Sequence, residues 1–169
     1  MSEKKVVITG GLGLLGRRIL RHLLPPSGSV RPAGRAVDVL IIDKNPIDAT
    51  DGKLSNTAFG CDSTTSTAVS TVQGELSSAE TTAAIKEFLA GGSDVSSDQS
   101  VSIFHLASVM SGQGEMDFEE ALRVNVEGTA SLLQTCREIG GRPRFVFASS
   151  TAAFGGGANV SDETKLLPQ

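Results

Sequence analysis

The chain has 169 residues, a formal net charge of −4, and seven Phe but no Trp or Tyr, so it suits one domain without the basic and aromatic surface of a nucleic-acid-binding protein. Its two cysteines are too few for a disulfide scaffold or a zinc site, and no metal site is expected. No apolar run approaches the roughly 20 residues that span a bilayer, and Arg17 and Arg18 interrupt the N-terminal run that could pass for a signal peptide, which predicts a cytoplasmic protein with no membrane partner.

Strand-like and helix-like segments alternate along the first half of the chain. Residues 6–8 are a short β-branched run typical of a buried strand. Residues 14–24 then show apolar side chains at helical spacing, until Pro25-Pro26 ends the pattern. A second buried strand is expected at residues 37–42. Residues 44–68 are rich in Ser, Thr, Asp and Gly without any period, which predicts a long surface loop.

The alternation continues through the second half. A third strand is expected at residues 69–73, after which Ser77-Ser78-Ala79-Glu80 matches a capping box at the start of a helix. A fourth strand is expected at residues 101–106. Residues 115–139 carry apolar side chains three or four apart and predict one long helix. A fifth strand is expected at residues 144–148.

This alternation of strands and helices is typical of an α/β fold. It predicts a Rossmann-like, doubly wound parallel sheet with right-handed crossovers and the strand order 3-2-1-4-5. We expect the whole chain, residues 1–169, to form one domain. A flavodoxin-like sheet is the alternative, because it shares most of the pattern but needs no glycine set in its first turn.

Glycines cluster between the first strand and the first helix, in Thr9-Gly10-Gly11-Leu12-Gly13-Leu14-Leu15-Gly16. Gly10 permits a tight turn, Gly13 lets the backbone approach a pyrophosphate, and Gly16 lets helix and strand pack closely. The helix then starts with free N–H groups, around Leu14-Leu15, and with the positive end of its dipole toward the phosphates. The context of strand before and helix after predicts a dinucleotide site, and a plain turn is the alternative.

Asp43 ends the second strand, where a carboxylate accepts hydrogen bonds from both hydroxyls of an adenosine ribose. A carboxylate also repels a 2′-phosphate, so the sequence favours NAD over NADP, although Lys44 leaves some room for NADP. An exposed Asp that only begins a loop is the other interpretation. The separation of Gly16 and Asp43 exceeds the usual ~20 residues, and an inserted loop at residues 27–35 accounts for it.

Three further segments complete a resemblance to the extended short-chain dehydrogenases/reductases, the NAD-dependent epimerase/dehydratase family. Ser102–Ser108 resembles the fourth-strand motif of this family, Arg123–Thr129 its central-helix motif, and Phe145–Gly155 its fifth strand with the active-site serine. The resemblance covers nearly the whole chain and is greatest to the D-erythronate dehydrogenase branch. It implies that Leu106 and Ala107, in the turn after the fourth strand, pass the ribose and nicotinamide of the cofactor.

The resemblance also suggests roles for single residues. Ser150 is the hydroxyl that would orient and polarise a substrate carbonyl or alcohol, with Ser149 and strand-end capping as alternatives. Glu75-Leu76 stands where the family often places Asp-Leu against the adenine. Asn125 lies on the apolar stripe of its helix, so we expect a buried amide that bonds strand backbone near the cofactor, and a purely structural role is equally open. His105 is more typical of a satisfied, partly buried histidine than of a proton carrier.

The chemistry of this family uses a tyrosine and a lysine four positions apart on the helix after the fifth strand, and this chain contains no tyrosine. We therefore expect the NAD-binding part of a sugar-acid dehydrogenase, truncated after the fifth strand and inactive alone, whose full-length form binds a small-molecule substrate. The alternatives are a part of a nucleotide-sugar epimerase or dehydratase and a non-catalytic NAD-binding or interaction protein. Residues 145–147 would leave an apolar strand edge that needs a covering partner, and a homo-oligomer is one option.

Overall fold

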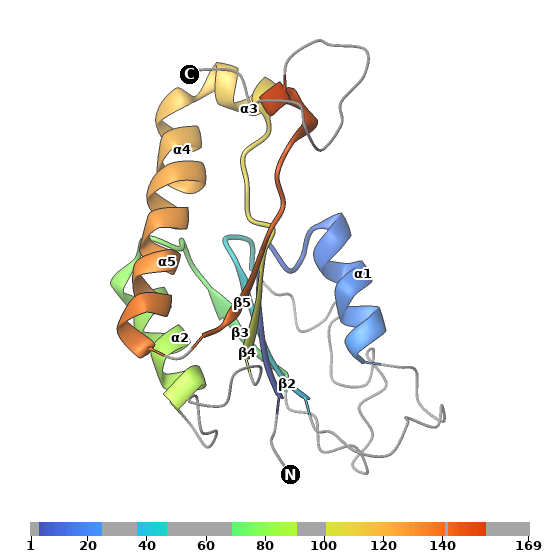
Figure 1. The fold of residues 1–169 in the computed structure, drawn as a ribbon. Coiled ribbons are helices and arrows are strands. Elements are labelled where there is room, and N and C mark those ends of the chain that lie inside the picture. Colours follow the sequence, from blue (N-terminus) through green and yellow to red (C-terminus); the bar gives the residue numbers. More distant parts are fainter. Residues whose placement is uncertain (1–3, 25–36, 47–68, 91–100, 141, 155–169) are drawn as a thin grey trace.

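Five parallel strands form a single sheet in the part of the chain that the structure, a computed structural model, describes (Figure 1). The described residues are 4–24, 37–46, 69–90, 101–140 and 142–154. The strands are β1 (Lys4–Thr9), β2 (Val37–Asp43), β3 (Val69–Gln73), β4 (Val101–His105) and β5 (Arg144–Phe147). Their order is β3-β2-β1-β4-β5. The predicted order is confirmed, and the flavodoxin-like alternative, which has the order 2-1-3-4-5, is excluded.

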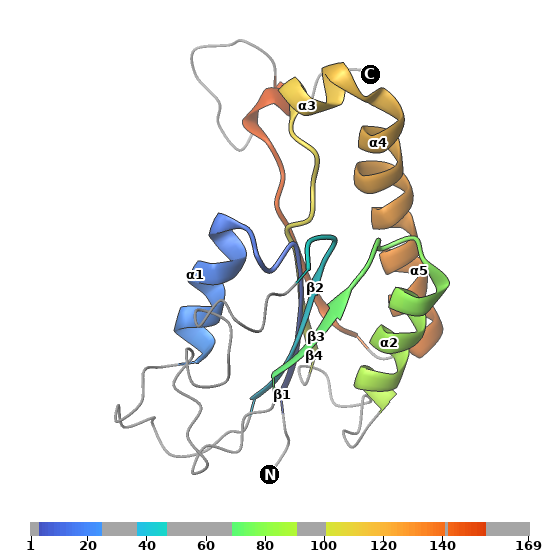
Figure 2. The same cartoon turned by 180° about the vertical axis from the view of Figure 1, so that it is seen from behind.

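Helices cover both faces of this sheet. They are α1 (Leu14–Leu23), α2 (Ala79–Ala90), α3 (Ser111–Met116), α4 (Phe118–Leu122), the π-helical segment η1 (Arg123–Glu127), α5 (Gly128–Ile139) and the 3₁₀ turn η2 (Thr151–Phe154). Helix α1 lies on one face, and α2 and α5 lie together on the other, as Figure 2 shows from behind. None of the helices in the described ranges has the length and apolar character of a membrane span.

Alternating side chains of the central strands supply two separate cores. Val6 and Ile8 of β1 pack with Leu20 of α1 on one face of the sheet. Val7, between them in sequence, packs with Ile85 of α2 on the other face. Both sets are buried because side chains alternate across a strand and helices cover both faces of this parallel sheet. The continuous apolar runs of β1 and β2 thus follow from burial on two sides.

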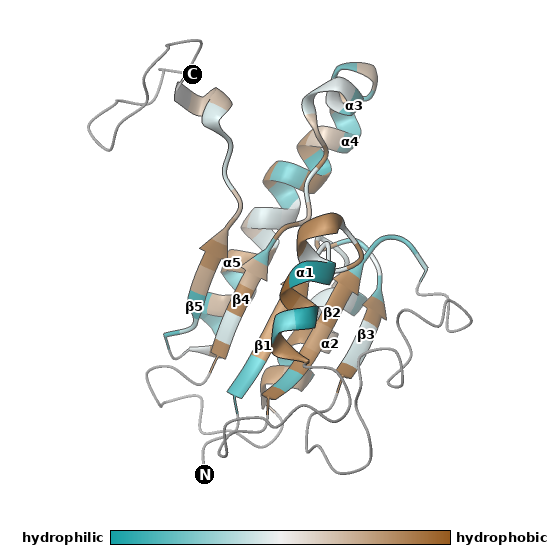
Figure 3. Ribbon diagram, turned by 90° about the vertical axis from the view of Figure 1, so that its right-hand side faces the viewer, coloured by the Kyte–Doolittle hydropathy of each residue, from teal (hydrophilic) through white to brown (hydrophobic). Residues whose placement is uncertain are grey.

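Strand β5 is an edge of the sheet among the described residues, and Figure 3 shows it as a mostly apolar strand. It pairs with β4 alone, and the side chains of Val146 and Phe147 are 39% and 54% exposed. The predicted apolar edge is therefore present in the described part of the chain. A strand edge of this kind is a surface onto which further polypeptide can pair.

The prediction of one helix over residues 115–139 is wrong, because Asp117 interrupts it. The backbone of Asp117 is not helical, its N–H bonds the Gln113 carbonyl at the end of α3, and its carboxylate accepts from the N–H of Glu120 at 2.9 Å. A side chain that caps a new helix competes with continuation of the old one. Apolar spacing runs on through this break, since it records side-chain type and not backbone direction.

Two smaller differences concern helix ends. The first turn of α2 is capped by Ser78, whose hydroxyl accepts from the N–H of Thr81 at 3.1 Å, and not by Ser77 as the predicted capping box requires. In η1 the N–H of Gly128 bonds the carbonyl of Arg123, five residues earlier, which widens the helix there. Such π-helical turns often occur at functional sites. Most of the expected loop at 44–68 and the tail after Gly155 lie outside the described residues.

Candidate functional site

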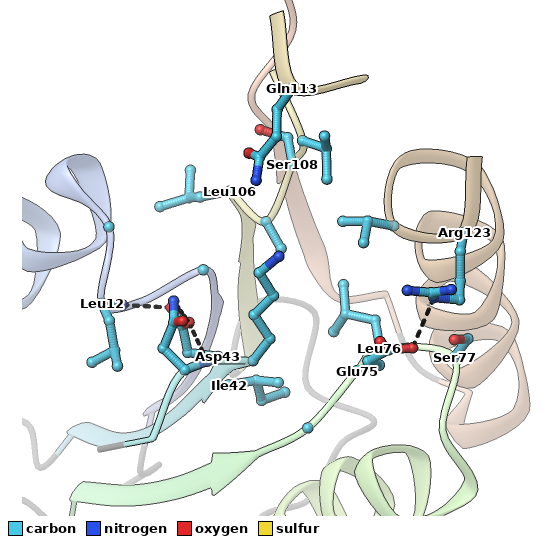
Figure 4. Close-up of a pocket in the computed structure, with 18 residues that line it drawn as sticks. Leu12, Ile42, Asp43, Glu75, Leu76, Ser77, Leu106, Ser108, Gln113 and Arg123 are labelled. Carbon is cyan, nitrogen blue, oxygen red and sulfur yellow. Dashed lines mark hydrogen bonds and ion pairs between the residues drawn. The ribbon is translucent and has the colours of Figure 1, made fainter. Parts of the chain in front are cut away.

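A cleft of about 470 Å³ opens at the carboxyl ends of the central strands (Figure 4). Its lining comes from the glycine turn after β1, the end of β2, the loop between β3 and α2, the loop after β4, and the start of η1. Seven residues that the sequence assigned to cofactor binding line it: Gly10, Gly13, Asp43, Glu75, Leu76, Leu106 and Ala107. This position, where the strand order reverses between β1 and β4, is the usual ligand site of an open α/β sheet.

The glycine turn packs closely against its neighbours. Gly10 has a φ of +67°, and a Cβ built on it would lie 2.8 Å from the backbone nitrogen of Ala107. A Cβ on Gly16 would lie 2.5 Å from the carbonyl oxygen of Gly11, so its closest contact is with the turn itself. Gly11 was given no role from the sequence, yet a Cβ on it would lie 2.5 Å from the Ile41 side chain. The pair Gly10-Gly11 was the feature of the sequence that could have indicated this close packing.

Helix α1 presents its N-terminus at this turn. Gly13 is the N-cap residue and makes no side-chain cap, and the first turn holds no acidic residue. The first backbone N–H groups and the positive dipole end are therefore available to an anion. The side chains of Leu14 and Leu15 are 74% and 55% exposed and do not line the cleft. Any contact that these two residues make with a phosphate would come from their backbone.

Asp43 fastens the glycine turn to the end of β2. It is 7% exposed, and its Oδ2 accepts from the N–H of Leu12 at 3.0 Å. Its Oδ1 accepts from the backbone and side-chain nitrogens of Asn45 at 3.0 and 3.1 Å. The interpretation as an exposed, loop-starting Asp is therefore wrong. A buried carboxylate at the cleft wall is a strong acceptor for hydroxyls of a ligand.

The loop after β4 is held at both of its ends. The Thr9 hydroxyl accepts from the N–H groups of Leu106 and Ala107 at 3.2 and 3.3 Å. The Asn125 amide accepts from the Val109 N–H at 2.8 Å and donates to the Val109 carbonyl at 3.0 Å. Asn125 thus bonds backbone beside the cleft, but the backbone of a loop and not of a strand. The expectation of burial is also wrong, because the residue is exposed on η1.

Two ion pairs close the other side of the cleft. Glu75 is paired with the Arg123 Nε at 3.1 Å, and Lys44 with Glu120 of α4. Leu76 is buried, and a Cβ on Gly128 would lie 3.2 Å from its own, so α5 packs tightly there. The sequence reading assigned no site role to Arg123 or to the lining residue Gln113. No local spacing relates them to Glu75, because the fold alone brings these segments together.

Ser150 lies apart from the described lining of the cleft. It follows β5, is exposed, and its hydroxyl accepts from the N–H of Ala152 at 3.2 Å at the start of η2. This contact fits the strand-end capping that the sequence left open. The role of Ser150 toward a substrate stays a prediction.

Comparison with known proteins agrees with this arrangement. Residues 7–168 match the 3-beta hydroxysteroid dehydrogenase/isomerase family. The chain belongs to this family. Together with the relatives below, this match confirms the resemblance to the extended short-chain dehydrogenases/reductases and their NAD-dependent epimerase/dehydratase group.

Among curated relatives, the D-erythronate dehydrogenase of Cupriavidus necator is 35% identical over 166 residues, which is 97% of this chain and 44% of that protein. Among solved structures, a nucleoside-diphosphate-sugar epimerase from Agrobacterium tumefaciens is 28% identical, with a TM-score of 0.63 over 91% of this chain and 39% of that one. A UDP-glucose-4-epimerase from Stenotrophomonas maltophila with bound NAD shares the fold, with 20% identity and a TM-score of 0.66 over 98% of this chain and 43% of that one. The chain spans less than half the length of the curated relatives it matches.

Proposed function

We propose that residues 1–169 form the NAD-binding domain of an NAD-dependent oxidoreductase that acts on a sugar-acid alcohol. Cofactor binding is proposed for this chain, and turnover for a protein of the relatives' full length, because the chain spans 44% of the D-erythronate dehydrogenase that it matches. The substrate class is taken from that relative. A cytoplasmic location, where the nicotinamide pool is found, is part of the proposal.

The observation that carries the proposal is the position of Asp43 beside the glycine turn. Its carboxylate is buried at the end of β2, 3.0 Å from the N–H of Leu12, on the same cleft wall as Gly10 and Gly13. An adenosine ribose bound there would meet the carboxylate, while the pyrophosphate would meet the N-terminus of α1. The same negative charge disfavours a 2′-phosphate, so NAD is preferred to NADP.

The remaining predicted residues divide between the two ends of such a ligand. Glu75 and Leu76 would meet the adenine, and Leu106 and Ala107 the nicotinamide ribose. NAD bound there would supply the hydride acceptor for oxidation of an alcohol to a carbonyl compound, with the hydroxyl proton passing to a base. Ser150 is proposed to orient that alcohol or carbonyl, so Ser150→Ala in a full-length protein should abolish turnover and leave NAD affinity nearly intact.

Calorimetric titration with NAD and NADP tests the binding proposal. We expect NAD to bind more tightly than NADP, and Asp43→Asn to weaken NAD about tenfold or more, since a hydrogen bond to a charged group contributes about 1.5–3 kcal/mol. Asp117→Asn is the matched control: it lies outside the cleft lining, and asparagine caps a helix as aspartate does. No heat of NAD binding, or equal affinity in Asp43→Asn, would contradict the proposal.

A nucleotide-sugar epimerase is the second candidate, and the 28% identity to the Agrobacterium tumefaciens epimerase favours it. An epimerase returns the hydride to the substrate, so it would convert a nucleotide-sugar without net formation of NADH. A dehydrogenase would accumulate NADH with a sugar acid. Absorbance of NADH with each substrate class, measured on a full-length protein, separates the two.

A further inference from the structure

His105 is the most enclosed titratable side chain beside the cleft, and the proposed function gives it no role. It lies at the end of β4 and is 1% exposed. Its Nδ1 is 2.7 Å from the Thr9 hydroxyl oxygen, and its Nε2 is 2.8 Å from the Thr129 hydroxyl oxygen. The rings of Phe145 and Phe147 lie against it, at 6.0 and 5.5 Å between centroids. Both ring nitrogens thus have hydroxyl partners.

The partners of those two hydroxyls decide where the protons lie. The Thr9 hydroxyl oxygen accepts from the N–H of Ala107, and it shares the N–H of Leu106 with the Thr9 backbone carbonyl, which lies 3.1 Å from that nitrogen. The proton of the Thr9 hydroxyl can then point to Nδ1. The Thr129 hydroxyl donates its proton to the backbone carbonyl of Asn125 at 2.7 Å. The Thr129 hydroxyl oxygen therefore accepts a hydrogen bond from Nε2 of His105. A neutral imidazole has one donor and one acceptor nitrogen. The network therefore selects the Nε2–H tautomer.

These hydrogen bonds form a closed ring of residues that includes one loop of the cleft. Thr9 holds the near end of the loop Leu106–Val109, and the side-chain amide of Asn125 holds its far end at Val109. His105 joins Thr9 to Thr129, and Thr129 bonds the backbone of Asn125. The loop lines the cleft from Leu106 to Val109 and packs against Gly10. Each member of the ring satisfies a polar group of the next.

We propose that His105, as the Nε2–H tautomer between Thr9 and Thr129, is a positioning residue that sets the loop Leu106–Val109 of the cofactor cleft. It acts through these two hydroxyls and touches no ligand. A histidine that only filled the core would also need hydrogen-bond partners. Those partners would have no reason to connect both of its ring nitrogens to the backbone of one loop. The link to the cofactor rests on the proposed function, whereas the link to the loop does not.

Long-range proton–nitrogen NMR of the 169-residue chain, at about pH 8 where an ordinary imidazole is neutral, tests the tautomer directly. We expect the His105 resonances to show a protonated Nε2 and an unprotonated Nδ1. The other histidine of the chain, His22, is exposed on α1 and serves as the internal reference. A protonated Nδ1, or an even mixture of tautomers as in a free imidazole, would overturn the proposal. This measurement needs neither a substitution nor a ligand.

Amide hydrogen exchange tests the effect on the loop. Thr129→Val removes the acceptor of Nε2 at nearly constant shape, and Thr129→Ser keeps it. We expect Thr129→Val to speed exchange at Ala107 and Val109 about tenfold, because a buried donor without a partner costs about 1–3 kcal/mol, and Thr129→Ser to restore slow exchange. The amide of Gly74, bonded to the Asp43 carbonyl at 3.0 Å, should be unaffected.

Thr135→Val is the matched control on the same helix. Thr135 is buried like Thr9 and His105, and its hydroxyl donates to the Ser131 carbonyl at 2.9 Å, away from the loop. It should leave exchange at Ala107 and Val109 unchanged. Equal exchange in Thr129→Val and Thr129→Ser, or equal acceleration by Thr135→Val, would show a general structural effect and overturn the proposal.

NAD titration of the same variants separates this inference from the proposed function. At a temperature where each variant is folded, Thr129→Val should weaken NAD about 3- to 10-fold, and Thr129→Ser should bind as the wild type does. If the loop responds but wild-type chain binds no NAD, the proposed function fails and the positioning role stands. If NAD binds equally to both variants, the loop does not set the cofactor site and the inference fails.

Discussion

The two walls of the cleft are held by different kinds of interaction. The inner wall, made of the glycine turn, the end of β2 and the loop after β4, is fixed by partly buried hydrogen bonds such as that of Asp43 to the Leu12 N–H. The outer wall, made of the β3–α2 loop and η1, is joined by an ion pair whose side chains are about half exposed: Arg123 is 45% and Glu75 47% exposed. Hydrogen bonds shielded from water hold two chain segments at a fixed distance, because breaking them leaves polar groups without partners. An exposed ion pair contributes only about 0–1 kcal/mol to stability.

This difference suggests that the two walls have different roles in binding a ligand. The inner wall carries the groups that would meet the pyrophosphate and the ribose, and its geometry is set before any ligand arrives. The outer wall can adjust to a ligand at small cost, because breaking an exposed ion pair exchanges it for hydration of both charges. Substitutions in the inner wall should therefore have larger effects on stability and ligand binding than substitutions in the outer wall.

Gly10→Ala should have the largest effect. The alanine would need a φ of +67°, and its Cβ would lie 2.8 Å from the Ala107 nitrogen, so the turn and the loop after β4 must move apart. We expect a loss of about 3 kcal/mol in the free energy of unfolding, measured by urea denaturation, with loss of NAD binding.

Gly112→Ala is the control for that experiment. A Cβ on Gly112 meets nothing within 4 Å, and its backbone φ is not positive. It should therefore leave the denaturation midpoint unchanged or slightly raised. A midpoint for Gly10→Ala within error of that of Gly112→Ala would show that the inner wall is less rigid than its contacts indicate.

The pH dependence of stability should report the buried His105. Burial lowers the pKa of His105 from its ordinary value of 6.5. Below pH 6.5 the unfolded chain binds a proton there that the folded chain resists, so the free energy of unfolding falls as the pH drops through 6.5 and levels off below the folded-state pKa. Urea midpoints across this range measure the slope.

Two variants assign that slope to its residue. His105→Gln should remove the fall near pH 6.5, because no group titrates at that position. His22→Gln, at the exposed histidine on α1, should leave it in place. A slope that survives His105→Gln would mean that another group is responsible for acid sensitivity in this window.

The smallest effect is expected in the outer wall. A double-mutant cycle with Arg123→Gln and Glu75→Gln should give a coupling free energy below about 1 kcal/mol, and roughly 1 M salt should remove it by screening. Urea denaturation of the four proteins provides the measurement. A coupling of about 2 kcal/mol or more would show that this ion pair holds the outer wall as firmly as the inner wall is held, and would contradict the proposed difference between the two walls.

The sequence was informative wherever the structure depends on neighbours along the chain. The sequence identified all five strands within one or two residues at each end. For β1 and β2 the signal was a continuous apolar run, because burial on two faces demands apolar side chains on both. Gly10 and Asp43 were placed at the cleft because each directly follows or ends a strand, and the carboxyl ends of parallel strands meet at one edge. The family motifs allowed the same inference for Leu106 and Ala107.

The wrong predictions concern local competition for hydrogen bonds, which the periodicity of apolar residues does not record. Asp117 ends one helix and caps the next, while the apolar spacing continues across it. Ser78 and not Ser77 caps α2, because the choice between adjacent serines depends on the path by which the chain leaves β3. In both cases side-chain hydrogen bonds to the backbone decided the outcome.

By itself, then, the sequence determined the alternation of strands and helices, the glycine turn after the first strand and the family, all of which follow from local patterns and motifs. The structure decided between the two strand orders that the sequence left open. Only the tertiary structure decided which distant residues share the cleft. It paired Arg123 with Glu75, joined Asn125 to Val109, and enclosed His105 between Thr9 and Thr129. The physical reason is that a hydrogen bond or ion pair needs its partners within a few ångströms, and only the packing of the helices onto the sheet brings these segments that close.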